Sequence, residues 1–308
     1  MFQNTIQTKT TLSGVGLHTG EQITLSLLPA LENTGIVFVR TDIKDKDNTV
    51  PALWNNVSDT QLCTVIANKD GVSVGTVEHL MSALRGCNID NAIIEIDGPE
   101  VPIMDGSAMP FVDLIRRAGL QKQNVLRCVI RILKEVSVEK DGKRVTLRPE
   151  NASVFGGEIE FDHPDIGCQS YQTTLLNGNF VHDIADCRTF GFLHEVEWMR
   201  SQGLARGGSL DNAIVLDREH VMNPEGLRRE DEFIRHKLLD AIGDLYLAGR
   251  QIVGAYDGIK AGHAINNDIL HALFADKENY EIIEHLHVIA PLFDAQSAAE
   301  KTEQKIYA

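Results

Sequence analysis

The chain has 308 residues, of which 43% are hydrophobic and 24% are charged, and its net charge is −15. These values describe a globular protein and exclude a disordered one, and the acidic balance argues against a nucleic-acid-binding protein, which needs a basic surface. We expect no signal peptide, no transmembrane segment and no disulfide framework, because no apolar run reaches ~20 residues and the five cysteines form no C-x-x-C pair.

The first half of the chain reads as strands, a helix, a strand and a second helix. Residues 22–43 contain two alternating strands around a turn, residues 78–98 contain a helix and then a strand, and residues 105–120 open another helix on a glycine turn. Glu78 and His79 begin the first helix. An acidic residue is common in a helix first turn, where the dipole favours it, so Glu78 alone carries no functional signal.

The second half repeats this order after a connection near residues 121–130. Residues 144–166, 235–258 and 261–276 match the three segments in turn. The repeat predicts an α+β fold, a duplicated two-domain sandwich with halves 1–124 and 125–308, whose helices pack between the sheets around a pseudo-two-fold axis. Equivalent helices would then face one another at the interface, where binding sites tend to form.

An extra segment of the second half, residues 191–216, is expected to form a βαβ-like insert. Just before it, Thr189 offers a hydroxyl suited to a developing oxyanion. The segment is apolar along one side, beginning with Phe192 and Leu193. This pattern fits either a helix that packs on the core or the wall of an apolar passage for a lipid chain. The polar residues 297–308 are expected to fray.

The helix predicted over residues 233–249 carries His236, Asp240 and Asp244 at steps of four, within roughly 80° of one another. A solvated charged face is the simplest interpretation. The spacing of His236 and Asp240 is also one with which two side chains of a helix bind a single metal ion. His79, from the equivalent helix, would complete a His/His/Asp set that leaves one position for water, as in catalytic zinc sites.

His263 lies in a glycine-flanked loop before a helix predicted over residues 267–275, with asparagines that suit its cap. We expect this histidine to be more exposed than a core residue and to transfer protons near neutral pH. Asp244, one turn beyond Asp240, is the candidate carboxylate that raises the pKa of His263 and keeps the ring charged. Lys237 adds positive charge nearby.

Six motifs stand in order along nearly the whole chain: "SGVGLHTG" (13–20), "TVEHLMSAL" (76–84), "PIMDGSA" (102–108), "CRTFGF" (187–192), "HKLLDAIGDL" (236–245) and "GHAINN" (262–267). Together they resemble the UDP-3-O-acyl-N-acetylglucosamine deacetylase family, zinc enzymes of lipid A biosynthesis in Gram-negative bacteria. The family's fold, two α/β halves with helices between the sheets, agrees with the internal repeat.

The resemblance implies roles for three groups of residues. The metal ligands would be His79, His236 and Asp240, for Zn²⁺ or for Fe²⁺ in the same site. The catalytic residues would be Glu78 as general base, His263 as the protonated acid, Asp244 as its partner, Thr189 at the oxyanion and Lys237 beside it. The substrate-binding residues would be Leu17, Lys143, Phe190 and Phe192.

The implied reaction removes the N-acetyl group from UDP-3-O-acyl-N-acetylglucosamine, the committed step of lipid A biosynthesis, and releases acetate. Such a hydrolysis requires polarisation of the carbonyl and protonation of the leaving amine. We expect a cytoplasmic monomer whose partner is this small-molecule substrate. Two alternatives stay open: a non-haem Fe(II) oxygenase, which uses the same two-histidine, one-carboxylate set, and a nucleotide-sugar or lipid binding protein with a structural metal closed by a fourth ligand such as Cys63.

Overall fold

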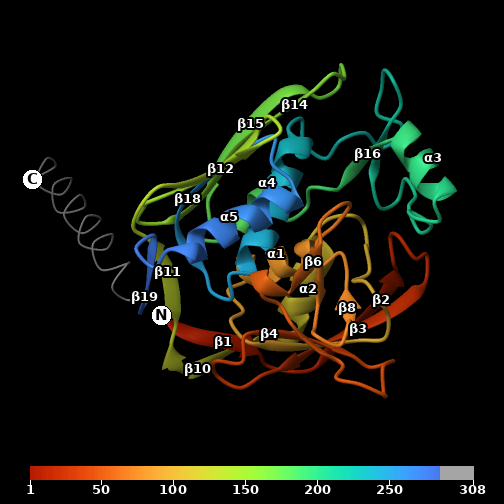
Figure 1. Cartoon of the computed structure of the whole chain (residues 1–308). Coiled ribbons are helices and arrows are strands. Elements are labelled where there is room, and N and C mark those ends of the chain that lie inside the picture. The colour runs from red at the N-terminus through yellow and green to blue at the C-terminus, as the bar shows by residue number, and fades with distance from the viewer. Residues whose placement is uncertain (285–308) are drawn as a thin grey trace, which may run out of the picture.

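Apart from the exposed helix of residues 193–201, the α-helices lie between two β-sheets in a computed structural model, which describes residues 1–284 (Figure 1). The elements of the first half are β1 (Phe2–Ile6), β2 (Thr10–Val15), β3 (Gln22–Pro29), β4 (Ile36–Arg40), β5 (Thr49–Pro51), β6 (Val57–Asp59), β7 (Val65–Ala67), β8 (Ser73–Val74), α1 (Glu78–Gly86), β9 (Ala92–Ile96), α2 (Met109–Ala118) and β10 (Leu120–Leu126). Those of the second half are β11 (Cys128–Ile132), β12 (Val136–Lys140), β13 (Lys143–Arg148), β14 (Ser153–Phe161), β15 (Gly167–Thr174), β16 (Phe190–Phe192), α3 (Leu193–Ser201), β17 (Ile214–Leu216), α4 (Glu232–Tyr246), β18 (Ile252–Ile259), α5 (His263–Ala275) and β19 (Tyr280–Glu284).

The two main sheets share a five-stranded pattern, to which the second sheet adds β11 and β19. In the first, β9 lies between β3, which is antiparallel to it, and β4, which is parallel, with β2 and β5 outside them. In the second, β18 lies between antiparallel β13 and parallel β14, with β12 and β15 outside them. The α+β fold with two similar halves, predicted from the internal repeat, is confirmed.

Helices α1 and α4 form the centre of the molecule. Hydrophobic residues alternate along strands such as β9, so each sheet turns one apolar face toward the helices. Thirteen of the 15 residues of α4 are buried, including His236, Asp240 and Asp244. The interpretation of these three residues as a solvated face is therefore wrong, because α1, α5 and β14 surround the helix.

The two central helices approach so closely that one of them needs glycine. A Cβ atom on Gly243 of α4 would lie 2.0 Å from the carbonyl oxygen of Glu78 on α1. One continuous hydrophobic core surrounds this contact and draws residues from both halves. The division of the chain at residues 124 and 125 stays a prediction.

Helix α5 begins four residues earlier than expected, at His263 instead of residue 267. The predicted asparagine cap is wrong as well, since the helix starts from Gly262 without a side-chain cap. The amide of Asn266 is buried and bonds to Asp244. Contacts with α4 therefore outweigh the local capping preference.

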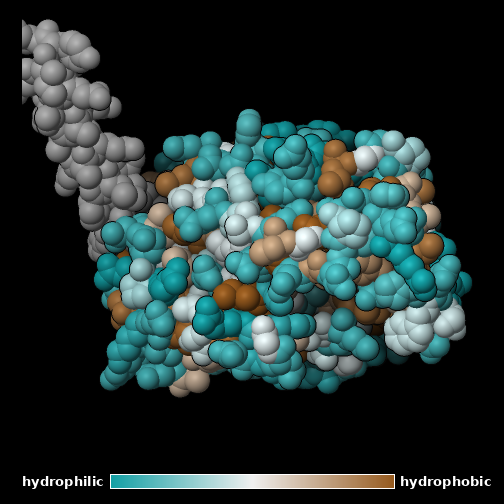
Figure 2. All heavy atoms as spheres, turned by 90° about the horizontal axis from the view of Figure 1, so that it is seen from above, coloured by the Kyte–Doolittle hydropathy of each residue, from teal (hydrophilic) through white to brown (hydrophobic). Residues whose placement is uncertain are grey.

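The insert folds as predicted. Strands β16 and β17 are parallel and α3 connects them, which is a βαβ unit. None of the α3 residues is buried, and Trp198 is 54% exposed, so the interpretation as a core helix is wrong. The face of the molecule in Figure 2 is mainly hydrophilic, with hydrophobic residues in small groups. No helix within residues 1–284 is long and apolar enough to cross a bilayer. The expected fraying of residues 297–308 lies outside the described residues.

Candidate active site

Three buried side chains from α1 and α4 converge between the two helices. His236 Nε2 lies 3.2 Å from Asp240 Oδ1, and His79 Nε2 lies 3.6 Å from the same oxygen. The two imidazole rings are perpendicular, with centroids 5.0 Å apart. One ligand atom from each residue lies within 4.8 Å of the others. The structure thus brings together the three residues expected as metal ligands.

The chemistry of this group fits a metal ion. Asp240 Oδ1 and His79 Nδ1 are buried and have no hydrogen-bond partner within residues 1–284. A buried carboxylate oxygen without a partner is costly, and a cation among the three side chains would supply one. Imidazole and carboxylate groups bind Zn²⁺ and other divalent transition metals. The buried group is therefore able to bind a metal ion, and Cys63 is not part of it among the described residues.

The charges of the group favour metal binding. Burial lowers the pKa of the His79 imidazole, which keeps this ring neutral and its lone pair available. Burial alone would raise the pKa of Asp240, but the His236 ring and the Lys237 ammonium lower it well below its usual range. Lys237 Nζ donates to Asp240 Oδ2 at 3.1 Å. Asp240 is therefore ionised at neutral pH.

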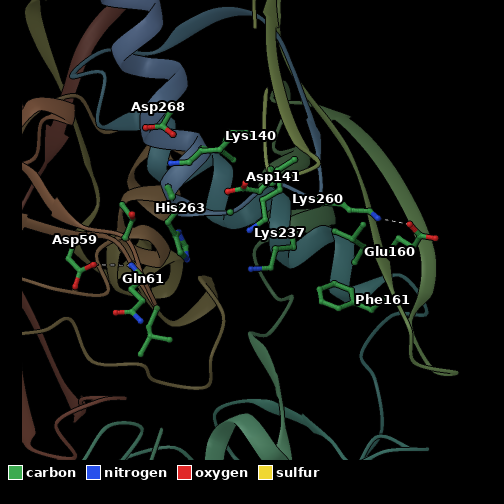
Figure 3. A pocket seen from close by; sticks show the side chains of 18 residues that line it. Asp59, Gln61, Lys140, Asp141, Glu160, Phe161, Lys237, Lys260, His263 and Asp268 are labelled. Atoms are coloured by element: carbon green, nitrogen blue, oxygen red, sulfur yellow. Dashed lines mark hydrogen bonds and ion pairs between the residues drawn. The ribbon is translucent and has the colours of Figure 1, made fainter. Parts of the chain in front are cut away.

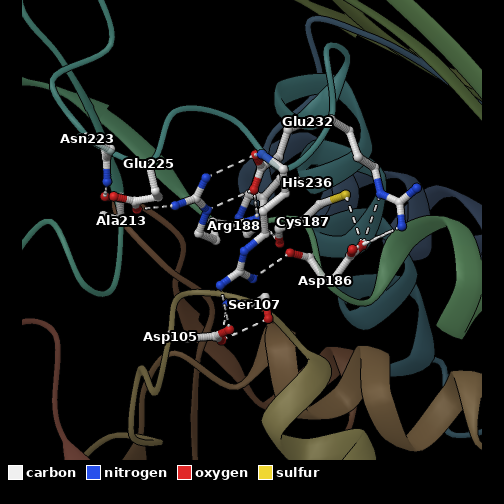
Figure 4. Close-up of polar contacts among 12 residues, drawn as sticks. Asp105, Ser107, Asp186, Cys187, Arg188, Ala213, Asn223, Glu225, Glu232 and His236 are labelled. Atoms are coloured by element: carbon white, nitrogen blue, oxygen red, sulfur yellow. Dashed lines mark hydrogen bonds and ion pairs between the residues drawn. The ribbon is translucent and has the colours of Figure 1, made fainter.

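A backbone carbonyl fixes the orientation of His236. Its Nδ1 lies 3.1 Å from the carbonyl oxygen of Cys187, which favours a proton on Nδ1 and leaves Nε2 for the metal. The next residue, Arg188, donates through its backbone N–H and its Nε to the carboxylate of Glu232, the first residue of α4 (Figure 4). This buried ion pair ties residues 187–189, including Thr189, to the helix that carries the metal group.

Glu78 and His263 face each other beside the metal group. Glu78 Oε1 lies 3.9 Å from His263 Nε2, and His263 Nδ1 is 2.9 Å from Asp244 Oδ2, so the predicted contact with Asp244 is present. His263 begins α5 and is not in a loop, but its side chain is 12% exposed against 3% for Asp244, so it is more exposed than its buried partner, as expected.

This pair carries opposite charges near neutral pH. Burial opposes the charge on His263, but Asp244 and then Glu78 raise its pKa to about 9. Burial also raises the pKa of Glu78 to about 7, against the opposing effect of His263. Between these values the carboxylate is ionised and the imidazole is protonated, which suits a general base and a general acid.

A pocket of about 760 Å³ opens beside this pair (Figure 3). Its wall includes His263, Lys237 and Phe161. Lys143 lines it as expected, at the start of β13. Further charged residues on the wall are Lys140, Lys260, Asp59, Asp141, Glu160 and Asp268. The wall thus carries four lysines and four carboxylates, and Lys260 pairs with Glu160.

Aromatic side chains extend from the metal group toward the insert. The Phe190 ring lies 6.4 Å from the His236 ring and 5.8 Å from the Phe161 ring, between centroids. Phe192 and Phe161 also line a second pocket, of about 710 Å³, together with Leu193 of α3. Since Phe161 lines both pockets, the two spaces adjoin at this ring.

The sequence profile of the UDP-3-O-acyl N-acetylglycosamine deacetylase family matches residues 3–275. Three relatives carry the name UDP-3-O-acyl-N-acetylglucosamine deacetylase. The protein of Phenylobacterium zucineum (strain HLK1) is 49% identical over 92% of this chain and 96% of its own length. The protein of Haemophilus influenzae (strain PittEE) is 48% identical over 91% of this chain and 92% of its own length. The protein of Shewanella pealeana (strain ATCC 700345 / ANG-SQ1) is 46% identical over 92% of this chain and 93% of its own length.

The chain belongs to this family. The resemblance inferred from the six motifs is confirmed, and the protein is an enzyme of a deacetylase family. The metal-binding, catalytic and substrate-binding roles of individual residues stay predictions.

Three of the four residues expected to bind substrate do not line the first pocket: Leu17, Phe190 and Phe192. Phe192 lines the second pocket instead. Leu17 is not among the described residues that line either space, and its carbonyl accepts a hydrogen bond from the Gly207 N–H in the insert. Thr189 lies at the base of the insert, where its N–H donates to the Gly106 carbonyl.

The sequence analysis assigned no catalytic role to two residues that form hydrogen bonds with Glu78 or Asp244. Thr64 donates from its backbone N–H to Glu78 Oε2 at 3.1 Å and from its hydroxyl to Asp244 Oδ1 at 2.6 Å. Asn266, expected only as a helix cap, donates to Asp244 Oδ2 at 2.9 Å. The motif "GHAINN" was a signal for Asn266, but no local pattern marks Thr64.

Proposed function

We propose that the protein removes the acetyl group from UDP-3-O-acyl-N-acetylglucosamine by hydrolysis, giving UDP-3-O-acyl-glucosamine and acetate. The observation that carries the proposal is the position of the Glu78–His263 pair beside the buried His79, His236 and Asp240 group. The relatives described above are named for this activity.

His79, His236 and Asp240 would hold a metal ion, which we propose to be Zn²⁺, with Fe²⁺ as the ion able to replace it. Such an ion polarises a carbonyl oxygen and lowers the pKa of water to roughly 7. The three residues would contribute two imidazole nitrogens and one carboxylate oxygen, and the group has no fourth such ligand among the described residues, which fits a site that also binds substrate or water.

Glu78 and His263 divide the proton transfers between them. Glu78, as carboxylate, accepts the proton of the attacking water. His263 has its Nδ1 committed to Asp244, so its Nε2 is the nitrogen that donates a proton to the leaving amine. The Thr189 hydroxyl and the positive His263 ring stabilise the oxyanion, with Lys237 nearby. Both transfers are needed because an amide is a weak electrophile with a poor leaving group.

The two pockets suit the two ends of the substrate. Lys143 and the other lysines of the first pocket provide positive charge for a diphosphate. Phe190 lies between this pocket and the metal group. Phe161, Phe192 and Leu193 form an apolar side of the second pocket, which we propose as the place of the acyl chain, while its other lining residues are polar or charged. We place the reaction in lipid A biosynthesis, in the cytoplasm of a Gram-negative cell, and expect a monomer with domains 1–124 and 125–308.

The test is acetate release from the nucleotide-sugar by the purified enzyme, together with its metal content. Glu78→Ala and His263→Ala should each lower turnover by ~10² or more while the metal content stays unchanged, as expected for general acid–base groups. His182→Ala, at an exposed histidine, is the matched control. Wild-type turnover in Glu78→Ala would remove the base assignment. Anaerobic assays of the Zn²⁺ and Fe²⁺ forms that showed an oxygen requirement would favour the oxygenase instead.

A further inference from the structure

The Asp244 carboxylate is saturated with hydrogen-bond donors. Its Oδ1 accepts the Thr64 hydroxyl at 2.6 Å, and its Oδ2 accepts His263 Nδ1 and Asn266 Nδ2, each at 2.9 Å. The donors come from two separate parts of the chain: Thr64 lies just before β7, and His263 and Asn266 lie at the start of α5. Three donors on one carboxylate fix its plane.

A fourth side chain fixes the orientation of the Asn266 amide. The Tyr256 hydroxyl donates to Asn266 Oδ1 at 2.8 Å, so the Nδ2 end of the amide must face Asp244. Tyr256 and Asn266 are buried, as is Thr64. A buried network with every member paired specifies a single arrangement.

Thr64 links the proposed general base, Glu78, to Asp244, the partner of the proposed general acid. Its backbone N–H bonds to Glu78 Oε2, while its side chain bonds to Asp244, the partner of His263. The two bonds are chemically separable, since a side-chain substitution removes only the second. On the basis of the proposed function, we propose that Thr64 and Asn266 are positioning residues of the deacetylation, which hold the Asp244 carboxylate so that His263 keeps Nε2 directed toward Glu78.

Loss of the Thr64 hydroxyl would leave Asp244 Oδ1 buried without its donor. The carboxylate could then rotate about its Cβ–Cγ bond, and the Nδ1 contact that orients the His263 ring would weaken. Within residues 1–284, the side chains of Thr64 and Asn266 form no hydrogen bond with His79, His236 or Asp240, so metal binding should be unaffected. The predicted defect is therefore in the chemical step and not in the metal content.

The test compares Thr64→Val, which keeps the shape without the hydroxyl, with Thr64→Ser, which keeps the hydroxyl. Thr64→Val should lower kcat by about 10- to 100-fold, the range for losing a hydrogen bond to a charged group, and change KM by less than about twofold. Thr64→Ser should retain at least about half of the wild-type kcat, and Asn266→Leu should behave like Thr64→Val. Thr5→Val is the matched control, since the Thr5 hydroxyl is equally buried and bonds to the Ala30 N–H, away from the site.

A double-mutant cycle separates positioning from a general structural effect. In an Asp244→Ala background, Thr64→Val should change kcat by less than about twofold, because the residue acts through Asp244. A loss as large as in the wild-type background, or wild-type kcat in Thr64→Val, would overturn the proposal. Melting temperatures check that each variant is folded. If the wild type itself released no acetate, the proposed function would fail, which is a different outcome from an active wild type with an equally active Thr64→Val variant.

Discussion

Replacement of Asp244 by asparagine tests how the enzyme controls the charge on His263. The substitution preserves the shape of the side chain but removes the negative charge 2.9 Å from His263 Nδ1. Burial lowers the pKa of His263, and Asp244 makes the largest contribution that raises it from its ordinary value of 6.5 to about 9. Without this charge, the pKa of His263 should fall toward its ordinary value of 6.5, since burial lowers it while Glu78 and Asp240 still raise it.

The size of the effect follows from the fraction of His263 that is protonated. At about pH 8, roughly nine tenths of the ring carries a proton when its pKa is about 9, and roughly 3% when its pKa is 6.5. A general acid acts only in its protonated form, so kcat/KM at this pH should fall by up to about 30-fold. Activity is lost as the pH rises through the pKa of the general acid. The substitution therefore moves the basic limb of the profile of kcat/KM against pH to lower pH.

On the acidic limb of the pH profile, activity depends on a group that must lose its proton. Glu78 acts as carboxylate, so activity is lost as the pH falls through its pKa of about 7, and a bound cation would shift this limb lower. The wild type should therefore be most active between these two limbs, which belong to the coupled pair and not to single residues. In Asp244→Asn the limbs should meet or cross, leaving a narrow and low maximum.

The assay is kcat/KM for acetate release from about pH 5.5 to 10, with metal content measured on the same samples. Asp257→Asn is the control, as a partly exposed aspartate of β18 outside the catalytic pair. A basic limb that stayed near its wild-type position in Asp244→Asn would refute the idea that Asp244 sets the charge on His263.

Three further predictions concern the metal, the insert and the packing of the central helices. His79→Ala and Asp240→Ala should each lower the bound metal measured by elemental analysis, and full metal occupancy in either would exclude it as a ligand. Phe192→Asp should weaken substrates with long acyl chains far more than those with short ones, and equal effects on both would place the passage elsewhere. Gly243→Ala should lower the melting temperature, since overpacking costs about 1–3 kcal/mol and its Cβ would meet backbone 2.0 Å away. Gly156→Ala, whose Cβ has its nearest contact at 3.5 Å, should not.

The topology could be predicted because the sequence contains it twice. Each match between the halves is weak alone, but the order of strands, helix, strand and helix holds across both, and the structure shows the same pairing around β9 and β18. The position of His79 beside His236 follows from the same argument. Equivalent helices of two similar halves must pack somewhere, and α1 and α4 do so at the centre.

Local patterns failed where tertiary contacts decide the structure. The asparagines after His263 have good capping propensity, but Asn266 bonds to Asp244 and Tyr256, and the helix begins without a side-chain cap. The start of α5 at His263 could not be predicted from its flanking glycines, because its contact with Asp244 of α4 is tertiary. The bond between Thr64 and Asp244 joins residues 180 positions apart, and the sequence has no periodic signal at such a distance.

The buried polar residues of α4 and the glycine among them have one physical explanation. His236, Asp240 and Asp244 are buried on the helix that packs against α1, and that close approach requires Gly243 to have no side chain. A bulkier residue there would push apart the helices that carry the metal group, and each buried charge would lose contacts that offset its desolvation. Helix propensity disfavours glycine within a helix by roughly 1 kcal/mol relative to alanine. The local cost of Gly243 is thus a direct consequence of assembling one site from two halves of the chain.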